Sequence, residues 1–400
     1  MEQRPYTLRE LFFKHIAQTS SSPLGLNIER AEGVFLYSKE KRYIDLISGV
    51  SVSNVGHGNK AVIEAVKDQI EKYAHLMVYG EMVEAPQVLH AKLLTSILPD
   101  SLQCVYYVNS GSEANEGALK LAKKVTGREQ MISCYNAYHG STHGALSMMS
   151  DAAFKAPFGP LLPNIDYINF NDISDLHKIT EKTACVLIEP IQGEGGVQIA
   201  TQEYMSALRK RCNDVGALLI FDEIQTGFGR TGKMFAFMNY DNVVPDIITL
   251  AKALGGGMPL GAFIASTEMM EQWQDNPPLG HITTFGGHPV SCAAALASLN
   301  LLINEPWVND VNRKSQLFVK KIKSHPLVKE IRAAGLLIAI DLKDVEKAKK
   351  VLYLLLDEGV LTDWFMFQPT SFRIAPPLCI TDDEIELAVL AIMRALDKLM

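Results

Sequence analysis

Apolar residues in the middle of the chain follow two alternating patterns. Between about residues 60 and 285, short β-branched and apolar runs such as 184–188 and 217–221 alternate with stretches in which apolar residues recur at helical spacing. The first pattern is typical of strands that are buried on both faces, and the second of amphipathic helices. Their alternation predicts a mainly parallel sheet wrapped by helices, the arrangement of an α/β domain.

The pattern changes after about residue 290. A helical period covers 292–303, alternating apolar residues predict a strand at 335–341, and further helices are expected at 345–358 and 382–400. Strands and helices are less regularly interleaved here than in the preceding part of the chain. This stretch therefore predicts a smaller α+β domain beside the large one, and a length of 400 residues is sufficient for both.

One lysine has an unusual position at the end of an apolar run. Lys252 follows the strand-like residues 246–250 and precedes the glycines at 255–257. An amine at the mouth of an apolar strand is partly shielded from water, and this favours the neutral, nucleophilic form that makes a Schiff base. Because most lysines are solvated surface residues, this feature alone is a weak indication.

A carboxylate occupies the corresponding place after another predicted strand. Asp222 follows the run 217–221, and the carboxyl ends of parallel strands meet at one edge of the sheet, where ligands bind in open α/β folds. Taken alone, Asp222 is equally compatible with a helix N-cap or a turn. Beside Lys252 it has a specific task. A Schiff-base lysine and an aspartate that keeps a ring nitrogen protonated are the arrangement that binds pyridoxal phosphate (PLP).

A third segment supplies a candidate site for the phosphate of this cofactor. Residues 109–115 follow a strand-like run and open a predicted helix. Ser110 and Glu113 have the spacing of a capping box, and Gly111 lets a ligand approach the backbone. Free amides at a helix N-terminus bind anions. A capped helix without a ligand is the common alternative, and the presence of the lysine and the aspartate makes phosphate binding the better interpretation.

Composition and charge restrict the remaining possibilities. Hydrophobic residues make up 48% and charged residues 21%, as in globular proteins, and the net charge of −7 argues against nucleic acid or an anionic membrane as partner. No apolar run is long enough to span a bilayer, and residues 1–7 lack the core of a signal peptide. The six scattered cysteines predict free thiols in a cytoplasmic protein. His139 and His143 have a metal-ligand spacing, but the glycine after each argues against a shared helix, so no metal is expected.

Taken together, these segments resemble the class III (subgroup II, ω-type) PLP-dependent aminotransferases, which have fold type I. The chain is similar to the ornithine, acetylornithine and 4-aminobutyrate aminotransferases nearly from end to end. The matching segments are 43–49, 56–57, 109–115, 138–140, 189–196, 221–232, 250–257, 283–287 and 372–377. The resemblance implies a large PLP-binding domain at 56–288, a small domain at 289–400, and an N-terminal segment, 1–55, that joins the small domain. It also implies a homodimer that shares its active sites.

The resemblance further implies which residues hold the cofactor. Tyr138 stacks on one face of the ring, Ile224 packs against the opposite face, and Gln225 reaches the ring hydroxyl. The remaining implied contacts are Lys252, Asp222, Ser110, Gly111, Ser112, His139 and Thr284 of the partner subunit.

Substrate recognition is implied for Arg373 and Glu194. A planar guanidinium binds an α-carboxylate in bidentate fashion, and in the resembled enzymes this arginine receives the carboxylate of glutamate or 2-oxoglutarate. The glutamate pairs with it when another donor is present, although a plain structural ion pair is the alternative. Ser141 stands where those enzymes have an arginine that binds the donor carboxylate, which puts their donors in doubt. Val50 and Tyr79 are expected to line the donor pocket.

These features predict ping-pong transamination. The donor amine displaces Lys252 from PLP, and the freed lysine moves a proton between the substrate carbon and the cofactor's C4′ carbon. The cofactor leaves this half-reaction as pyridoxamine phosphate, and 2-oxoglutarate restores PLP. An amino-acid racemase, epimerase or aminomutase on the same fold is the alternative, because fold does not determine function. A binding protein without activity is disfavoured, since every cofactor position carries a chemically competent residue.

Overall fold

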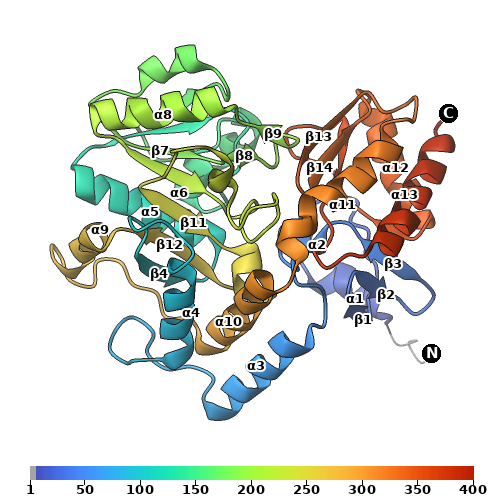
Figure 1. Cartoon of the computed structure of the whole chain (residues 1–400), viewed down its shortest axis with the longest axis horizontal. Coiled ribbons are helices and arrows are strands. Elements are labelled where there is room, and N and C mark those ends of the chain that lie inside the picture. The colour runs from blue at the N-terminus through green and yellow to red at the C-terminus, as the bar shows by residue number, and fades with distance from the viewer. Residues whose placement is uncertain (1–5) are drawn as a thin grey trace.

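A seven-stranded sheet forms the centre of the larger of two lobes (Figure 1). In spatial order its strands are β4 (Cys104–Val108), β12 (Gly261–Ala265), β11 (Ile247–Leu250), β10 (Leu218–Asp222), β7 (Thr183–Ile188), β5 (Gln130–Cys134) and β6 (Ile165–Ile168). Strand β12 runs antiparallel to both of its neighbours, and the other neighbouring pairs are parallel. The prediction of a mainly parallel sheet is therefore confirmed.

Helices cover both faces of this sheet. In β7, Cys185 and Leu187 belong to the apolar cluster that includes α5, whereas Val186 and Ile188 belong to the cluster that includes α8. Every residue of β7 is buried, which explains why its sequence is continuously apolar. The helices of this lobe are α3 (Lys60–Lys72), α4 (Ala85–Thr95), α5 (Gly111–Thr126), α6 (His143–Ser147), α7 (Ala152–Lys155), α8 (Gln202–Val215), α9 (Thr267–Glu271) and α10 (Pro289–Asn304).

Helix α5 begins at the predicted place, with one difference at its cap. The Ser110 side chain accepts a hydrogen bond from the Glu113 amide at 3.2 Å, as expected. The Glu113 carboxylate, however, accepts from the amide of Asn109 at 2.6 Å and not from that of Ser110, so the capping box is not formed. Gly127 ends the helix in the left-handed conformation with φ of 67°.

The smaller lobe combines both ends of the chain. The N-terminal β1 (Arg30–Glu32), β2 (Phe35–Tyr37) and β3 (Arg42–Asp45) form one sheet with β15 (Val360–Leu361), which pairs in parallel with β3. A second sheet contains β13 (Glu330–Ala334), β14 (Leu337–Asp341) and β16 (Ser371–Ile374). The helices are α11 (Trp307–Ile322), α12 (Val345–Asp357) and α13 (Asp382–Asp397). The structure thus joins the first and last parts of the chain in one sheet.

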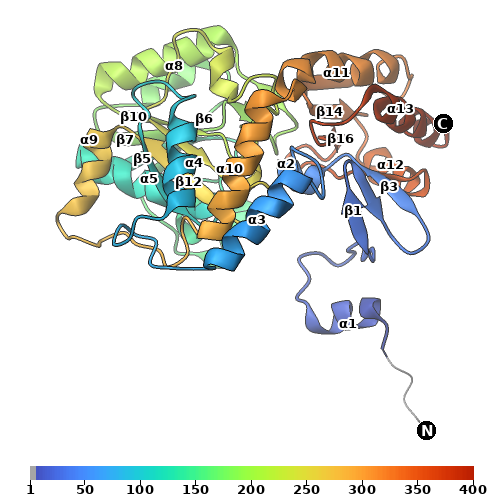
Figure 2. The ribbon, with the colours of Figure 1, turned by 60° about the horizontal axis from the view of Figure 1, so that its bottom comes forward.

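The predicted elements of this lobe are present with shifted limits. The run at 335–341 forms β14, but all five residues of the strand are buried, so its alternation does not reflect one exposed face. Helix α10, expected at 292–303, packs mainly on α3 and α4 of the larger lobe, as the crossing ribbons in Figure 2 also show. The limits 1–55, 56–288 and 289–400 stay our proposed domain division, with α10 as the part of the last segment that packs on the larger lobe.

The computed structural model describes residues 6–400. The stretch expected to lack a signal peptide lies largely outside this range, in residues 1–5. Helix α1 (Leu8–His15) buries none of its residues and lies apart from both lobes in Figure 2. Within 6–400, the helices are all too short or too polar to cross a membrane.

Candidate active site

A cavity of about 350 Å³ opens where strands β10 and β11 end. This volume lies in the usual range for sites that bind small molecules. Ten of the predicted site residues line it: Ser110, Gly111, Ser112, Tyr138, His139, Glu194, Asp222, Ile224, Gln225 and Lys252. The structure thus brings together residues from five distant parts of the sequence. They meet at the carboxyl ends of the parallel strands, where the sequence predicted a site.

Lys252 begins a short 3₁₀ turn directly after β11. Its backbone has φ of 49°, a left-handed conformation that is uncommon for residues other than glycine and is found more often at functional sites. Burial lowers the pKa of the Lys252 amine, although the carboxylates of Glu194 and Asp222 partly offset this effect. A lowered pKa increases the fraction of neutral amine, which is the form that attacks a carbonyl carbon.

Asp222, the last residue of β10, is fixed by hydrogen bonds on both oxygens. Its Oδ2 accepts from Asn115 Nδ2 at 2.9 Å and contacts His139 Nδ1 at 2.8 Å, and its Oδ1 accepts from the Ile224 amide at 3.1 Å. Asn115 is in turn oriented by Thr249, whose hydroxyl donates to Asn115 Oδ1 at 2.7 Å. These bonds hold a buried carboxylate in one orientation beside the cavity.

The N-terminus of α5 provides backbone donors on another wall of the cavity. Gly111 and Ser112 lie in the first turn, where no carbonyl of the same helix can accept their N–H groups. Ala114 and Glu113 already donate to Ser110. A β-carbon at Gly111 would lie 2.8 Å from Ile224 Cδ1, so a glycine is required for this close packing. The first turn is therefore open to an anion.

Gln225 presents an acceptor without a partner to the same cavity. Its Oε1 is buried and has no hydrogen-bond partner among residues 6–400, while its Nε2 donates to Glu194 Oε1 at 3.3 Å. A β-carbon at Gly193 would lie 1.7 Å from this Oε1, so only glycine leaves room for the amide. A buried acceptor without a partner costs free energy unless a bound group donates to it.

Glu194 lines the cavity, and Arg373 lies behind it on β16. Arg373 Nη2 contacts the two Glu194 oxygens at 2.8 and 3.0 Å, and its Nε pairs with Asp363 at 2.9 Å. Burial raises the pKa of Glu194, but the guanidinium more than offsets this and holds the pKa below its usual value. Arg373 Nη1 is buried and has no hydrogen-bond partner in the described part of the chain. A carboxylate that replaced Glu194 would therefore find two donor nitrogens.

The other predicted residues do not line this cavity within one chain. Ser141 is exposed, with its hydroxyl 3.3 Å from that of Tyr138. Val50 is half-buried in the short helix α2 (Ser48–Ser51), and the nearby Val52 lines the cavity in its place. Tyr79 lines a separate cavity of about 420 Å³, and Thr284 is exposed next to Thr283, which lines that cavity. Their predicted roles stay proposals.

Two residues near the cofactor position escaped the sequence analysis as site residues. Glu189 directly follows β7 and lines the cavity, where its oxygens accept from the amides of Tyr138 at 3.0 Å and Gly193 at 2.9 Å. Burial raises its pKa to about 7. The rule that found Asp222, a carboxylate directly after an apolar run, would also have found it. Asn115 has no such local signal, because it lies inside a helix.

The argument about His139 and His143 needs one correction. A helix, α6, does begin at His143 and includes Gly144, so this glycine does not prevent a helix. His139 precedes that helix and contacts Asp222, which places the two histidines in different local structures. Across residues 6–400, no three His, Cys, Asp or Glu side chains are grouped so as to hold a metal ion.

The donor and acceptor groups around the cavity fit PLP. The open amides at the start of α5 match its phosphate, the Asp222 carboxylate matches a protonated ring nitrogen, and Gln225 Oε1 matches the ring hydroxyl. The enclosed Lys252 amine matches its aldehyde. The fold and the cavity together define a PLP-dependent enzyme of fold type I.

Comparison with known proteins gives the family. Residues 16–396 match the family described as aminotransferase class-III. The acetylornithine aminotransferase of Methanopyrus kandleri is 39% identical over 97% of this chain and 98% of that protein. The [LysW]-aminoadipate semialdehyde/glutamate semialdehyde transaminase of Sulfolobus acidocaldarius is 37% identical over 94% and 96%. The chain belongs to the class III aminotransferases, and its activity is PLP-dependent transamination.

A solved structure agrees with this assignment. The ornithine aminotransferase of Toxoplasma gondii, whose structure has partial occupancy of PLP at the active site, is 29% identical and has a TM-score of 0.89. The match covers 97% of this chain and 93% of that one. The proteins compared here are all aminotransferases or transaminases by name, which favours transamination over the racemase, epimerase or aminomutase alternative.

Proposed function

We propose that this aminotransferase transfers the amino group of a small amino donor to 2-oxoglutarate, and that glutamate is the product. The observation that carries the proposal is the buried pair of Glu194 and Arg373 at the wall of the cavity that Lys252 enters. The α-carboxylate of 2-oxoglutarate or glutamate is the group that Arg373 would bind. The reaction follows a ping-pong order, because both substrates use the same cavity.

PLP, when bound, supplies an electron-accepting ring that stabilises the negative charge left at the substrate carbon after its proton is removed. Lys252 acts on that proton. Its amine takes the proton from the carbon that carries the amino group and returns it on the cofactor side, as base and then as acid. The lowered pKa of this amine keeps a fraction of it neutral and ready to accept a proton.

The other cavity residues bind and orient. Asp222 is a fixed negative charge for the ring nitrogen, because Asn115 and His139 prevent its carboxylate from turning away. Tyr138 and Ile224, which both line the cavity, would cover the two faces of the ring and exclude water from it. The amides at the start of α5, with the hydroxyls of Ser110 and Ser112, hold the phosphate.

Glu194 selects between the two substrates by moving its side chain. While it pairs with Arg373, the positive charge is cancelled, and a donor without a carboxylate at that end can enter. When 2-oxoglutarate enters, its carboxylate replaces Glu194 on Nη2 and also reaches the unpartnered Nη1. Asp363 stays on the Nε side and keeps the guanidinium in place.

The donor differs from that named for the relatives. Two of them are acetylornithine aminotransferases by name, and this makes N-acetylornithine the first donor to consider. Ser141 nevertheless lacks the charge that would hold the donor's carboxylate, and its hydroxyl lies 3.3 Å from that of Tyr138. We therefore propose a donor whose binding does not depend on a carboxylate at this position.

The proposal includes a homodimer in which each subunit completes the other's site. The segments that carry Tyr79 and Thr284 lie side by side along the second cavity and expose large apolar side chains, among them Leu279, Ile282 and Phe285. An exposed apolar patch of this kind is typical of a protein interface. A cytoplasmic location is proposed on the six free cysteines, which are typical of a reducing compartment.

The test uses purified enzyme loaded with PLP and a panel of donors: ornithine, N-acetylornithine, lysine, 4-aminobutyrate, β-alanine and apolar α-amino acids. Each is assayed with 2-oxoglutarate and, in parallel, with pyruvate, which lacks the second carboxylate. We expect glutamate from at least one donor, and a kcat/KM for pyruvate lower by about 10-fold or more. Equal use of pyruvate would contradict the proposed preference for 2-oxoglutarate as acceptor. Conversion of a donor without any keto acid would instead establish an isomerase.

A further inference from the structure

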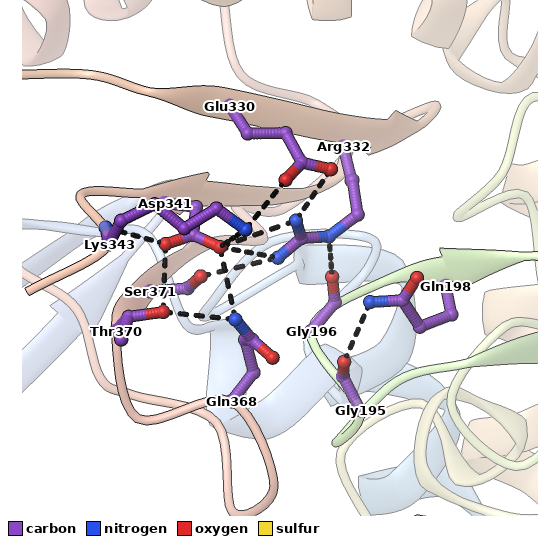
Figure 3. Close-up of polar contacts among 10 residues, drawn as sticks. All are labelled: Gly195, Gly196, Gln198, Glu330, Arg332, Asp341, Lys343, Gln368, Thr370 and Ser371. Carbon is purple, nitrogen blue, oxygen red and sulfur yellow. Dashed lines mark hydrogen bonds and ion pairs between the residues drawn. The ribbon is translucent and has the colours of Figure 1, made fainter. Parts of the chain in front are cut away.

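Residues of the smaller lobe donate hydrogen bonds to the backbone of the turn that carries Glu194. It connects β8 (Ile191–Gln192) with β9 (Gln198–Ile199) in the larger lobe. The Phe367 amide donates to the carbonyl of Glu194 at 3.0 Å, and Arg332 Nε donates to the carbonyl of Gly196 at 2.6 Å. Figure 3 shows the Arg332 side chain reaching from β13 to this carbonyl. Two backbone anchors therefore lie on either side of Gly195.

Contacts on the other side of its guanidinium hold Arg332 in this orientation. Its Nη atoms contact Asp341 Oδ2 at 3.3 and 3.4 Å, and its Nη2 donates to the Ser371 hydroxyl at 3.3 Å (Figure 3). Glu330 pairs with it at 2.8 Å. Asp341 is fully buried and is fixed by further bonds from Thr370 and Gln368. The position of Arg332 is thus set by β13, β14 and β16, the last of which also carries Arg373.

We propose that Arg332 is a positioning residue for substrate exchange, one that aligns the Glu194 turn with Arg373. The proposal rests on the proposed function, in which Glu194 must leave Arg373 and return in each cycle. Because the carbonyls of Glu194 and Gly196 are both anchored, the side chain of Glu194 can turn while the backbone beneath it stays. Arg332 therefore favours the state in which Glu194 covers Arg373, and it acts through Glu194 and not on the substrate.

This role predicts the sign of the effect. Without the Arg332 anchor, Glu194 competes less strongly for the guanidinium, so a dicarboxylate binds Arg373 more tightly. The same change exposes the positive charge of Arg373 in the donor half-reaction, and the donor binds less well. A residue with a merely structural role would weaken the binding of both substrates, because it would loosen the whole wall of the cavity.

The variants are chosen to separate the anchor from the surrounding charge cluster. Arg332→Gln removes the guanidinium, and Arg332→Lys keeps a positive charge beside Asp341. Lys343→Gln is the matched control. Lys343 pairs with Asp341 at 3.0 Å and with Glu330 at 2.9 Å, but it has no contact with the Glu194 turn. One further pair of proteins carries Glu194→Ala with and without Arg332→Gln, which measures whether the two residues act together.

Binding of glutarate, a dicarboxylate that cannot react, is measured by calorimetry on the PLP-loaded enzymes. The KM values of donor and 2-oxoglutarate are measured in parallel. For Arg332→Gln we expect the Kd of glutarate to fall by about 10-fold, the effect of one lost charge-assisted hydrogen bond, and the KM of the donor to rise. Arg332→Lys should lie between this variant and the wild type. Lys343→Gln should leave both values unchanged.

Three results would overturn the inference. The first is weaker binding of glutarate by Arg332→Gln together with a similar effect in Lys343→Gln. The second is an effect of Arg332→Gln that is as large in the Glu194→Ala background as in the wild type. The inference expects no effect in that background. The third is a wild-type enzyme that neither binds glutarate nor uses 2-oxoglutarate, which would also remove the proposed co-substrate. Thermal unfolding of each variant shows whether the protein is folded, and Arg332→Lys tests the anchor if the glutamine variant is not.

Discussion

Replacing Ser141 with arginine should turn the donor pocket into one that selects donors with a carboxylate. The substitution disturbs little. The Ser141 amide donates to the Ser112 hydroxyl at 3.3 Å through the backbone, and the side chain loses only a weak contact with the Tyr138 hydroxyl. A charge-assisted hydrogen bond contributes about 1.5–3 kcal/mol, or roughly 10- to 150-fold in kcat/KM. Because Ser141 is exposed in the single chain, solvent screens the new charge, and we expect the lower end, about 10-fold.

The assay compares kcat/KM for N-acetylornithine and 4-aminobutyrate with that for a donor amine that lacks a carboxylate. Ser141→Gln is the control, since it adds a side chain of similar reach without the charge. Ser141→Arg should improve only the carboxylate donors, and this gain should shrink as the salt concentration rises. The reasoning is refuted if the wild type already uses N-acetylornithine efficiently and Ser141→Arg adds nothing, because the carboxylate would then be bound elsewhere.

Three further substitutions test the cofactor site. Lys252→Ala should abolish transamination and leave the fold intact, because it removes the amine that moves the proton; turnover at the wild-type rate would contradict the assignment. Asn115→Ala removes one of the two contacts to Oδ2 of Asp222, so we expect a loss of about 1–3 kcal/mol in the free energy of unfolding and weaker binding of PLP, measured by thermal unfolding and by absorbance titration. Glu189→Gln removes a carboxyl whose pKa burial raises to about 7 from an ordinary value of 4.5. The folded state keeps this proton to a higher pH than the unfolded state, so the wild type should lose about 3 kcal/mol of stability between about pH 4.5 and 7. Glu189→Gln should lack this loss. Equal slopes of unfolding free energy against pH in the wild type and in Glu189→Gln would show that the pKa of Glu189 is not raised.

The sequence predicted best those features that depend on neighbouring residues along the chain. Asp222 and Lys252 each follow a short apolar run, and a run of this kind is typical of a strand that is buried on both faces. Strand β12 (Gly261–Ala265) has an equally apolar sequence, yet it runs antiparallel, and an apolar run reads the same in either direction. Strand direction depends on the connections between strands, which composition does not contain.

The contacts between side chains were harder to predict from the sequence than the places of single residues in the fold. Ser110 was identified as the cap of α5. The sequence did not show that the Glu113 carboxylate would accept from the amide of Asn109 and not from that of Ser110, because this depends on where Asn109 lies. The link between Asn115 and Asp222 joins residues 107 positions apart. The contact of Arg332 with Gly196 spans 136 positions and crosses from one lobe to the other. Such contacts follow from the packing of the lobes and have no signal in local spacing.

Arg373, the proposed site for the keto acid, and Ser141, the proposed site for the donor, lie on different lobes. This separation would let one substrate change without the other. Arg373 is on β16 of the smaller lobe, where the carboxylates of Glu194 and Asp363 pair with its guanidinium. A substitution there would leave a buried charge without its partner, which costs several kcal/mol. Ser141 lies in an exposed loop of the larger lobe, where a charge can be lost at little cost in stability. Divergence within this fold should therefore alter the amino donor more readily than the keto acid, and the present chain, with serine at 141 and an intact pair at Arg373, has the combination that this reasoning predicts.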